Sequence, residues 1–285
     1  MSATALSLAH PASLDEAAAL LRERAGAAPL AGGTDLVPLV RDGLVRPDEL
    51  VDVRRALPRG VEGGRIGAGT TLAELERSDE IPSALREACR LAASPQLRTM
   101  GTIGGNLLQA TRCWYWRLAF PCRLHGGDAC HARDGEHREH AIFANGFCAS
   151  AHPSDPAAAL LALGAEVETT ARRFPLAELY RLPDEGDRDL TTLEQGELIL
   201  ALHVEPPDAS IYLKAMDRRR FAFPLVGVAA VRHGREARIA LAGVAPIPYL
   251  LPSAQELDRA TPLPGTAYKV EIARALVSRA LAALG

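Results

Sequence analysis

Two short glycine-containing runs, AGGTDL at residues 31–36 and TIGGNL at residues 102–107, carry the most information about this chain. The first run follows an apolar stretch at 28–31 that is predicted to be a short buried strand. Glycine has no Cβ, so the backbone can approach a ligand closely and adopt a positive φ. Successive N–H groups beside the start of a helix suit an anion such as a pyrophosphate. Neither run fits G-x-G-x-x-G, so a dinucleotide site and two ordinary turns both remain open on these residues alone.

Strands alternate with helices on both sides of the two runs. SLDE at 13–16 is a capping box that predicts a helix to about Arg24. An amphipathic helix is expected at 83–93, and it contains Cys89. Further strands are expected at 49–53, 65–68 and 165–169, and further helices at 70–77 and 156–163. This alternation is typical of an α/β domain.

The pattern changes after about residue 174. Strands are predicted at 198–204, 211–216, 225–231 and 238–244, with a turn at His233-Gly234, and helices at 256–260 and 270–284. Sequential strands around a tight turn indicate an antiparallel sheet. We therefore predict an α/β domain at 1–174, with its boundary near 172–178, and a smaller α+β domain at 175–285.

The composition excludes several classes of protein. The 285 residues carry 32 Lys+Arg and 35 Asp+Glu, a net charge of −3, which disfavours nucleic acid or an anionic membrane as main partner. No apolar run approaches the ~18 residues of a membrane span. Residues 1–17 lack a basic region, so no signal peptide is expected. An odd number of cysteines in a chain with no expected signal peptide also argues against a disulfide framework.

Four of the five cysteines are clustered, with the spacing C-x8-C-x7-C-x17-C: Cys113, Cys122, Cys130 and Cys148. Zinc modules usually pair ligands as C-x2–4-C, and bacterial ferredoxins use C-x2-C-x2-C; neither pattern occurs here. Four thiolates from one long loop suit a four-iron cluster. A zinc site that also uses His125, His131, His137 or His140 is one alternative. Incidental cysteines beside the core aromatics of 114–116 are another, and Cys89 is expected to be a small core side chain.

The basic residues are almost all arginine, because Lys214 and Lys269 are the only lysines among 32. A compact ammonium differs from a planar guanidinium fork. The composition therefore favours a specific role for Lys214 over a place on the surface of a strand. Lys269 is expected to lie on the surface of a helix.

The runs 31–36 and 102–106, together with 212–219 and 223–226, resemble the FAD-binding medium subunit of the xanthine dehydrogenase and molybdenum hydroxylase family. Further motifs place the resemblance within one branch of this family. These are RCWYW at 112–116, the three later cysteines of the cluster, HAI at 140–142 and HPSD at 152–155. They look like the branch of periplasmic aldehyde oxidoreductases, whose flavin subunit also holds a [4Fe-4S] cluster.

The resemblance implies a fold and a set of binding residues. The fold is α+β: a two-part, PCMH-like FAD-binding domain with a cysteine-rich loop inserted at 110–150, then an antiparallel sheet with helices. The [4Fe-4S] ligands would be the four clustered cysteines, and no acid–base catalytic residue is expected. The implied FAD-binding residues are Pro29, Leu30, Ala31, Gly32, Gly33, Thr34, Asp35, Leu36, Thr102, Gly104, Gly105, Asn106, Asp155, Ile199 and Lys214.

The implied function is electron transfer within an oxidoreductase, a heterotrimer in which a large subunit with a molybdenum cofactor oxidises an aldehyde or a heterocycle. Electrons would pass through the [2Fe-2S] clusters of a small subunit to FAD and an outside acceptor. A stand-alone flavin oxidoreductase and a metal-stapled structural subunit without flavin are the alternatives. The expected compartment is the cytoplasm, or the periplasm by export with a partner.

Overall fold

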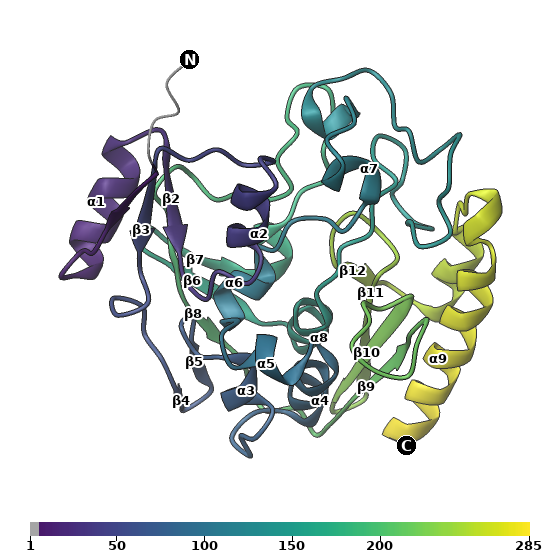
Figure 1. Ribbon diagram of the computed structural model, residues 1–285. Coiled ribbons are helices and arrows are strands. Elements are labelled where there is room, and N and C mark those ends of the chain that lie inside the picture. Colours follow the sequence, from purple (N-terminus) through teal and green to yellow (C-terminus); the bar gives the residue numbers. More distant parts are fainter. Residues whose placement is uncertain (1–5) are drawn as a thin grey trace.

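The computed structural model describes residues 6–285. Residues 1–5, which begin the stretch where no signal peptide is expected, lie outside the described residues. The strands form three sheets, in the orders β1-β3-β2, β4-β5-β8-β6-β7 and β12-β11-β10-β9. Figure 1 places the small sheet at one end of the molecule, the last sheet toward the other end, and helices between them.

The first sheet is parallel and joins β1 (Ser7–Ala9), β3 (Glu49–Asp52) and β2 (Ala27–Leu30). Its helix α1 (Leu14–Glu23) begins as predicted, because the Ser13 hydroxyl accepts a hydrogen bond from the Glu16 amide at 3.1 Å. Ala17, Leu21 and Val51 form the small core between helix and sheet. The first glycine run then connects β2 to α2 (Leu36–Arg41).

The second sheet is antiparallel and contains strands from distant parts of the chain. They are β4 (Val61–Glu62), β5 (Arg65–Gly67), β6 (Glu166–Thr169), β7 (Arg173–Pro175) and β8 (Ile199–His203). The domain boundary predicted at 174/175 falls inside this sheet, because β8 follows the boundary yet pairs with β5 and β6. The change to the third sheet comes between His203 and Ala209, the start of β9.

Four short helices lie around a central buried helix, α8 (Asp155–Leu163). The four are α3 (Leu72–Leu75), α4 (Ser83–Leu91), α5 (Pro95–Arg98) and α6 (Ile103–Leu107). Every residue of α8 is buried. Its run of alanine and leucine has no polar face because α8 packs against α4, α6 and the third sheet at once.

The third sheet is an antiparallel meander covered by the C-terminal helix. It contains β9 (Ala209–Ala215), β10 (Val226–His233), β11 (Glu236–Ala242) and β12 (Tyr249–Leu251). The turn predicted at His233-Gly234 joins β10 to β11. The helix expected at 256–260 is instead a 3-10 segment, Ala254–Arg259, while α9 (Tyr268–Leu284) covers the sheet face opposite α8 (Figure 1).

Residues 110–150, here called the cysteine segment, contain little regular structure. It includes α7 (Trp114–Arg117), one 3-10 turn at Arg123–His125 and otherwise turns and extended chain. Figure 1 shows it at the top of the molecule, between the first glycine run and the start of α9. In residues 6–285 no helix is both long and apolar enough to cross a membrane.

Candidate functional site

The two glycine runs line one cavity of about 270 Å³, here called the glycine cavity. The end of β2 and the start of α2 supply one wall, and the start of α6 supplies the other. Eleven of the predicted FAD-binding residues line it: Pro29, Ala31, Gly32, Gly33, Thr34, Asp35, Leu36, Thr102, Gly104, Gly105 and Ile199. Runs about 70 residues apart in the chain therefore face a common space.

Close packing of the backbone explains why glycine occupies the first run. A Cβ on Gly32 would lie 1.9 Å from the Met100 carbonyl oxygen, far inside contact distance. Gly33 has a φ of +68°, a conformation that other residues rarely adopt. The run AGGTDL can therefore pass directly against the loop that leads into the second run.

The two runs differ in the state of their amide groups. In the second run the amides of Ile103, Gly104 and Gly105 already donate, to Thr70 O, Ala68 O and the Thr102 hydroxyl. Within the described chain, the amides of residues 33–36 have no such acceptor. They precede or begin α2, where the first amides of a helix have no intrahelical partner. The first run is therefore the wall able to bind an anion through backbone N–H groups.

A neighbouring cavity of about 230 Å³ continues the first one. It shares Thr34, Asp35, Thr102 and Gly105 with the glycine cavity, and adds the predicted residues Asn106 and Asp155. Together the two cavities form an elongated space that suits an extended molecule. Leu30 and Lys214 line neither cavity.

Lys214 lies one layer behind this second cavity, in contact with Asp155. Its ammonium is 2.8 Å from Asp155 Oδ2 and donates to Leu91 O at 3.0 Å, and its side chain is fully buried. The alternative place for Lys214 on a strand surface is therefore wrong. Tyr212 donates its hydroxyl to Asp155 Oδ1 at 2.5 Å. Burial raises the pKa of Asp155, and the Lys214 and Tyr212 contacts oppose this by favouring the carboxylate.

Sequence reasoning missed two residues of this group. Tyr212 lies two positions before Lys214 on β9, so period-2 alternation puts both side chains on one face and could have indicated it. Ser154 caps α8 by accepting from the Ala157 amide and donates its hydroxyl to Asn106 Oδ1 at 2.6 Å. No local pattern in the sequence marks that second contact, because it joins residues 48 positions apart.

All four clustered cysteines are free thiols; Cys122 and Cys148 are buried, and Cys113 and Cys130 are half-buried. Burial raises the pKa of Cys113 to about 11, and the charges of Cys122 and Cys130 add to the shift. Burial likewise raises the pKa of Cys148 to about 12, with contributions from Cys130 and Cys113. Cys113 thus interacts with each of the other three, and Cys89 lies apart in the core, as predicted.

Among the described residues, no group of three or more His, Cys, Asp or Glu side chains is arranged to hold a metal ion. Three buried imidazole nitrogens of the cysteine segment nevertheless have no hydrogen-bond partner: His131 Nε2, His137 Nδ1 and His140 Nδ1. The other ring nitrogen of His140 lies 3.2 Å from Cys113 Sγ. Buried polar atoms normally have partners, so these three nitrogens are unused polar capacity within the segment.

The prediction for Lys269 is wrong, because its side chain is completely buried. Its ammonium donates to the carbonyls of Glu139, His140 and Gly243 at 2.7–3.0 Å. Burial lowers the pKa of Lys269 to about 7. This lysine fastens the cysteine segment to the end of β11 and the first turn of α9.

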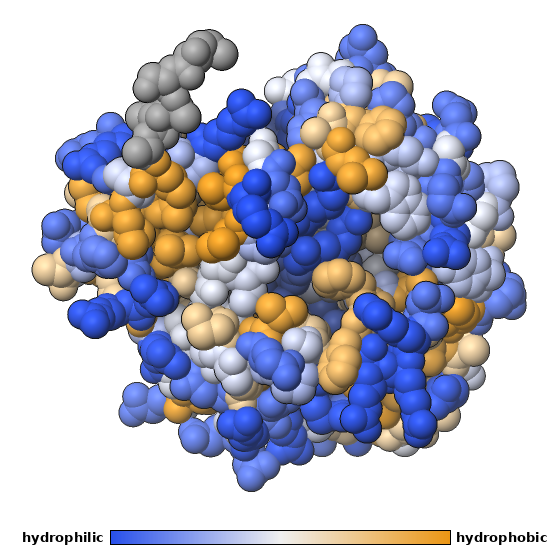
Figure 2. Space-filling view, viewed as in Figure 1, coloured by the Kyte–Doolittle hydropathy of each residue, from blue (hydrophilic) through white to orange (hydrophobic). Residues whose placement is uncertain are grey.

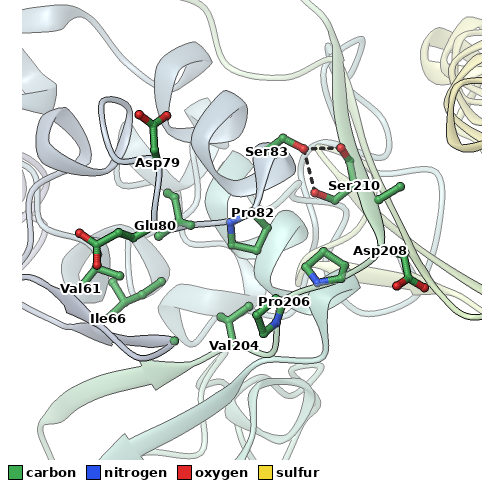
Figure 3. A pocket seen from close by; sticks show the side chains of 14 residues that line it. Val61, Ile66, Asp79, Glu80, Pro82, Ser83, Val204, Pro206, Asp208 and Ser210 are labelled. Carbon is green, nitrogen blue, oxygen red and sulfur yellow. Dashed lines mark hydrogen bonds between the residues drawn. The ribbon is translucent and has the colours of Figure 1, made fainter.

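A cleft of about 280 Å³ on another part of the surface contains none of the predicted residues. Figure 3 shows its apolar floor, which includes Ile66, Val204 and Pro206, and the acidic side chains of Asp79 and Asp208 at its edge. Asp79 is paired with Arg86, and Asp208 accepts from the Gly234 amide. The candidate site is therefore the glycine cavity with its extension.

Known proteins resemble this chain over most of its length. Residues 4–207 match the family described as the FAD binding domain in molybdopterin dehydrogenase. The chain is 38% identical over 258 residues to the FAD-binding subunit of an aldehyde oxidoreductase from Escherichia coli, covering 84% of this chain and 81% of that protein. It is 44% identical over 106 residues to the medium chain of carbon monoxide dehydrogenase from Afipia carboxidovorans, 34% of this chain and 37% of the relative.

Solved structures show the same fold. A chain of carbon monoxide dehydrogenase from Oligotropha carboxidovorans superposes with a TM-score of 0.72 at 24% identity, covering 100% of this chain and 99% of the other. The likeness in fold therefore extends over the third sheet and α9, which lie beyond the residues of the family match.

Proposed function

This chain belongs to the family of FAD-binding subunits of molybdenum hydroxylases, and on that premise we propose that it binds FAD in the glycine cavity and its extension and transfers electrons within such an oxidoreductase. One observation carries the proposal. Residues 33–36, whose amides have no acceptor within the described chain, line a cavity whose opposite wall is the second glycine run. This arrangement fits a pyrophosphate held by backbone N–H groups between two adjacent recesses.

The residues present fit the cofactor. The amides of residues 33–36 would hold the pyrophosphate, and the backbone of Gly104 and Gly105 leaves room for close approach. Apolar residues of the same cavity, such as Leu36 and Ile199, would contact the adenosine half. The rest of the cofactor would extend toward Asn106 and Asp155. FAD, when bound, supplies reversible uptake of two electrons.

Lys214 acts on the flavin end through Asp155. A buried carboxylate held by an ammonium and a phenol has its position and charge set by both partners. Asp155 can then present a defined acceptor to the cofactor, and Lys214 keeps that acceptor ionised. In this proposal Lys214 acts through Asp155, one layer behind the cavity, rather than by direct contact with the flavin.

We further propose that Cys113, Cys122, Cys130 and Cys148 hold the [4Fe-4S] cluster. The four free thiols of this one segment, the 3.2 Å approach of His140 to Cys113 and the three unpartnered imidazole nitrogens support a missing polar group there. Each cysteine of a four-iron cluster binds a different iron, so the four need not converge on one point as ligands of a single ion do. Such a cluster, when bound, carries one electron at a time.

The proposed partners are a large subunit with the molybdenum cofactor and a small subunit with [2Fe-2S] clusters. Several relatives are named medium chains or medium subunits, which supports a complex with larger and smaller chains. Figure 2 shows apolar surface over the N-terminal sheet and α2, and exposed apolar side chains there include Leu8 and Val37. Such surface suits subunit contacts.

The absorption spectrum of the purified chain, with assays for iron and sulfide, tests these proposals. We expect flavin bands, a broad iron–sulfur shoulder and about four Fe per chain. A chain with four iron and no FAD affinity would contradict the flavin proposal and support a metal-stapled structural subunit. A chain with FAD and zinc would contradict only the cluster. Isolation without larger and smaller partners would favour a stand-alone flavin oxidoreductase.

A further inference from the structure

Asp35 lies in the first glycine run, yet its carboxylate is fully engaged with the other proposed site. Oδ2 accepts from the Ala110 amide at 2.7 Å. Oδ1 lies 2.8 Å from Arg112 Nη2 and 2.9 Å from Arg117 Nη2. All three donors belong to the first residues of the cysteine segment.

The contacts of Asp35 hold the turn that carries Cys113. Arg117 is the last residue of α7, and it also donates to Thr111 O at 2.8 Å. Cys113 is the N-cap of α7, and its amide donates to the Thr111 hydroxyl at 3.1 Å. Arg112, the neighbour of Cys113, lines the extension of the glycine cavity. The turn that carries this thiol is therefore fastened to the glycine run by one carboxylate.

The burial of these groups makes the contact strong enough to matter. Asp35, Arg112 and Arg117 expose only 17%, 30% and 18% of their side chains. Charge-assisted hydrogen bonds in such partly buried positions are stronger than pairs in open solvent. Asp35 lines the cavity while its carboxylate holds the turn, so the order of each site depends on the other.

We propose that Asp35 is a positioning residue that couples the glycine cavity to the cysteine segment, so that occupancy of either site favours the other. The coupling rests on the proposed function, because it concerns FAD and iron at these two sites. Binding couplings are reciprocal, and typical values change affinity by about 5- to 150-fold. The backbone of Asp35 keeps its expected place in the FAD-binding run, and this role of its side chain adds to it.

Alkylation of Cys113 in the iron-free chain tests the coupling without enzyme activity. The rate is followed by mass spectrometry of the peptide that contains Cys113, with and without saturating FAD. In the wild type we expect FAD to slow alkylation at least about fivefold. In Asp35→Asn the alkylation rate of Cys113 at saturating FAD should equal the rate of the same variant without FAD. Direct shielding of Cys113 by FAD would instead persist in this variant and overturn the proposal.

Three controls keep the result decisive. Asp42→Asn removes an exposed carboxylate just after the same helix, which is paired with the neighbouring Arg41, and should behave as wild type. Arg117→Gln removes one of the donors to Asp35 and should give the same result as Asp35→Asn. It therefore still tests the coupling if Asp35→Asn folds poorly. In the reciprocal arm, equilibrium dialysis should show FAD binding at least about fivefold tighter to the iron-loaded chain, and equal binding in Asp35→Asn.

The outcomes separate the two proposals. If the wild type binds FAD but neither alkylation nor the dialysis ratio changes, the coupling is wrong and the FAD site stands. If the wild type binds no FAD, both are overturned.

Discussion

The glycine cavity and the cysteine segment lie side by side but are built in different ways. The cavity is formed by the end of β2 and the starts of α2 and α6, which are held in place by backbone hydrogen bonds and close backbone packing. The cysteine segment has only α7 and one 3-10 turn, and it is held by side chains from distant parts of the chain. Regular structure can preform a site, whereas an irregular segment depends on a few buried polar contacts.

Those contacts come from both ends of the protein. Asp35 holds the start of the segment, while Lys269 holds residues 139–140 near its end. Between them, Asn145 donates to Thr261 O at 2.7 Å, and the Thr261 amide donates to Ile142 O at 2.8 Å. We therefore expect some substitutions to loosen the cysteine segment and leave the glycine cavity intact. Others should damage the cavity and leave the segment intact.

The largest expected effect separates Cys113 from Cys89. Cys113→Ser should reduce iron from about four per chain to less than about one, because a cluster that loses a thiolate ligand is no longer held on all sides. Cys89→Ser should keep its iron, since Cys89 is buried in the main core. Iron and sulfide assays measure both variants. Equal iron in the two would refute the ligand assignment.

Gly32→Ala should damage the cavity and spare the cysteine segment. Its Cβ would lie 1.9 Å from Met100 O, so the backbone of one run must move away from the other. Overpacking of about 1–3 kcal/mol corresponds to roughly 5- to 150-fold weaker FAD binding, measured by flavin fluorescence. Gly146→Ala is the matched control, because a Cβ there would meet nothing within 4 Å. Unchanged affinity in Gly32→Ala would contradict the proposed cavity.

Lys269→Met should have the opposite pattern, loosening the cysteine segment and sparing FAD binding. The variant leaves the carbonyls of Glu139, His140 and Gly243 buried without their donor. We expect a loss of about 2 kcal/mol in the free energy of unfolding, measured in urea. Limited proteolysis should cut within residues 110–150 faster than in the wild type. Faster cleavage elsewhere, with the segment still protected, would show that Lys269 does not hold it.

The last expected effect, no larger than the one before it, is the pH dependence that Lys269 adds to the free energy of unfolding. Its pKa is lowered from 10.5 to about 7 in the folded chain, so between these values the unfolded chain binds more protons. The free energy of unfolding of the wild type should therefore rise relative to Lys269→Met between pH 7 and 9, by roughly 2 kcal/mol. The cysteines titrate in both chains, so their contribution cancels in the difference between the two free energies of unfolding. A flat or falling difference would contradict a lowered pKa.

Much of the fold and of the cavity could be predicted from local patterns. The cap at Ser13, the helix at 83–93, the hairpin at His233-Gly234 and both glycine runs depend on residues close together in the chain. The family motifs also lie within short runs. The extent of the second sheet could not be predicted in this way, because β8 pairs with residues at least 30 positions earlier, and its apolar alternation suits either sheet equally well.

The sequence alone determined the elements, the two glycine runs and the family, because hydrophobic periodicity, caps and turn residues act over a few positions. Only the tertiary structure decided what the charged side chains do. Both lysines are buried, Lys214 against Asp155 and Lys269 among carbonyls, and Asp35 turns from the cavity to the cysteine segment. A buried charge takes the partner that packing brings within reach, and that partner can come from any part of the chain.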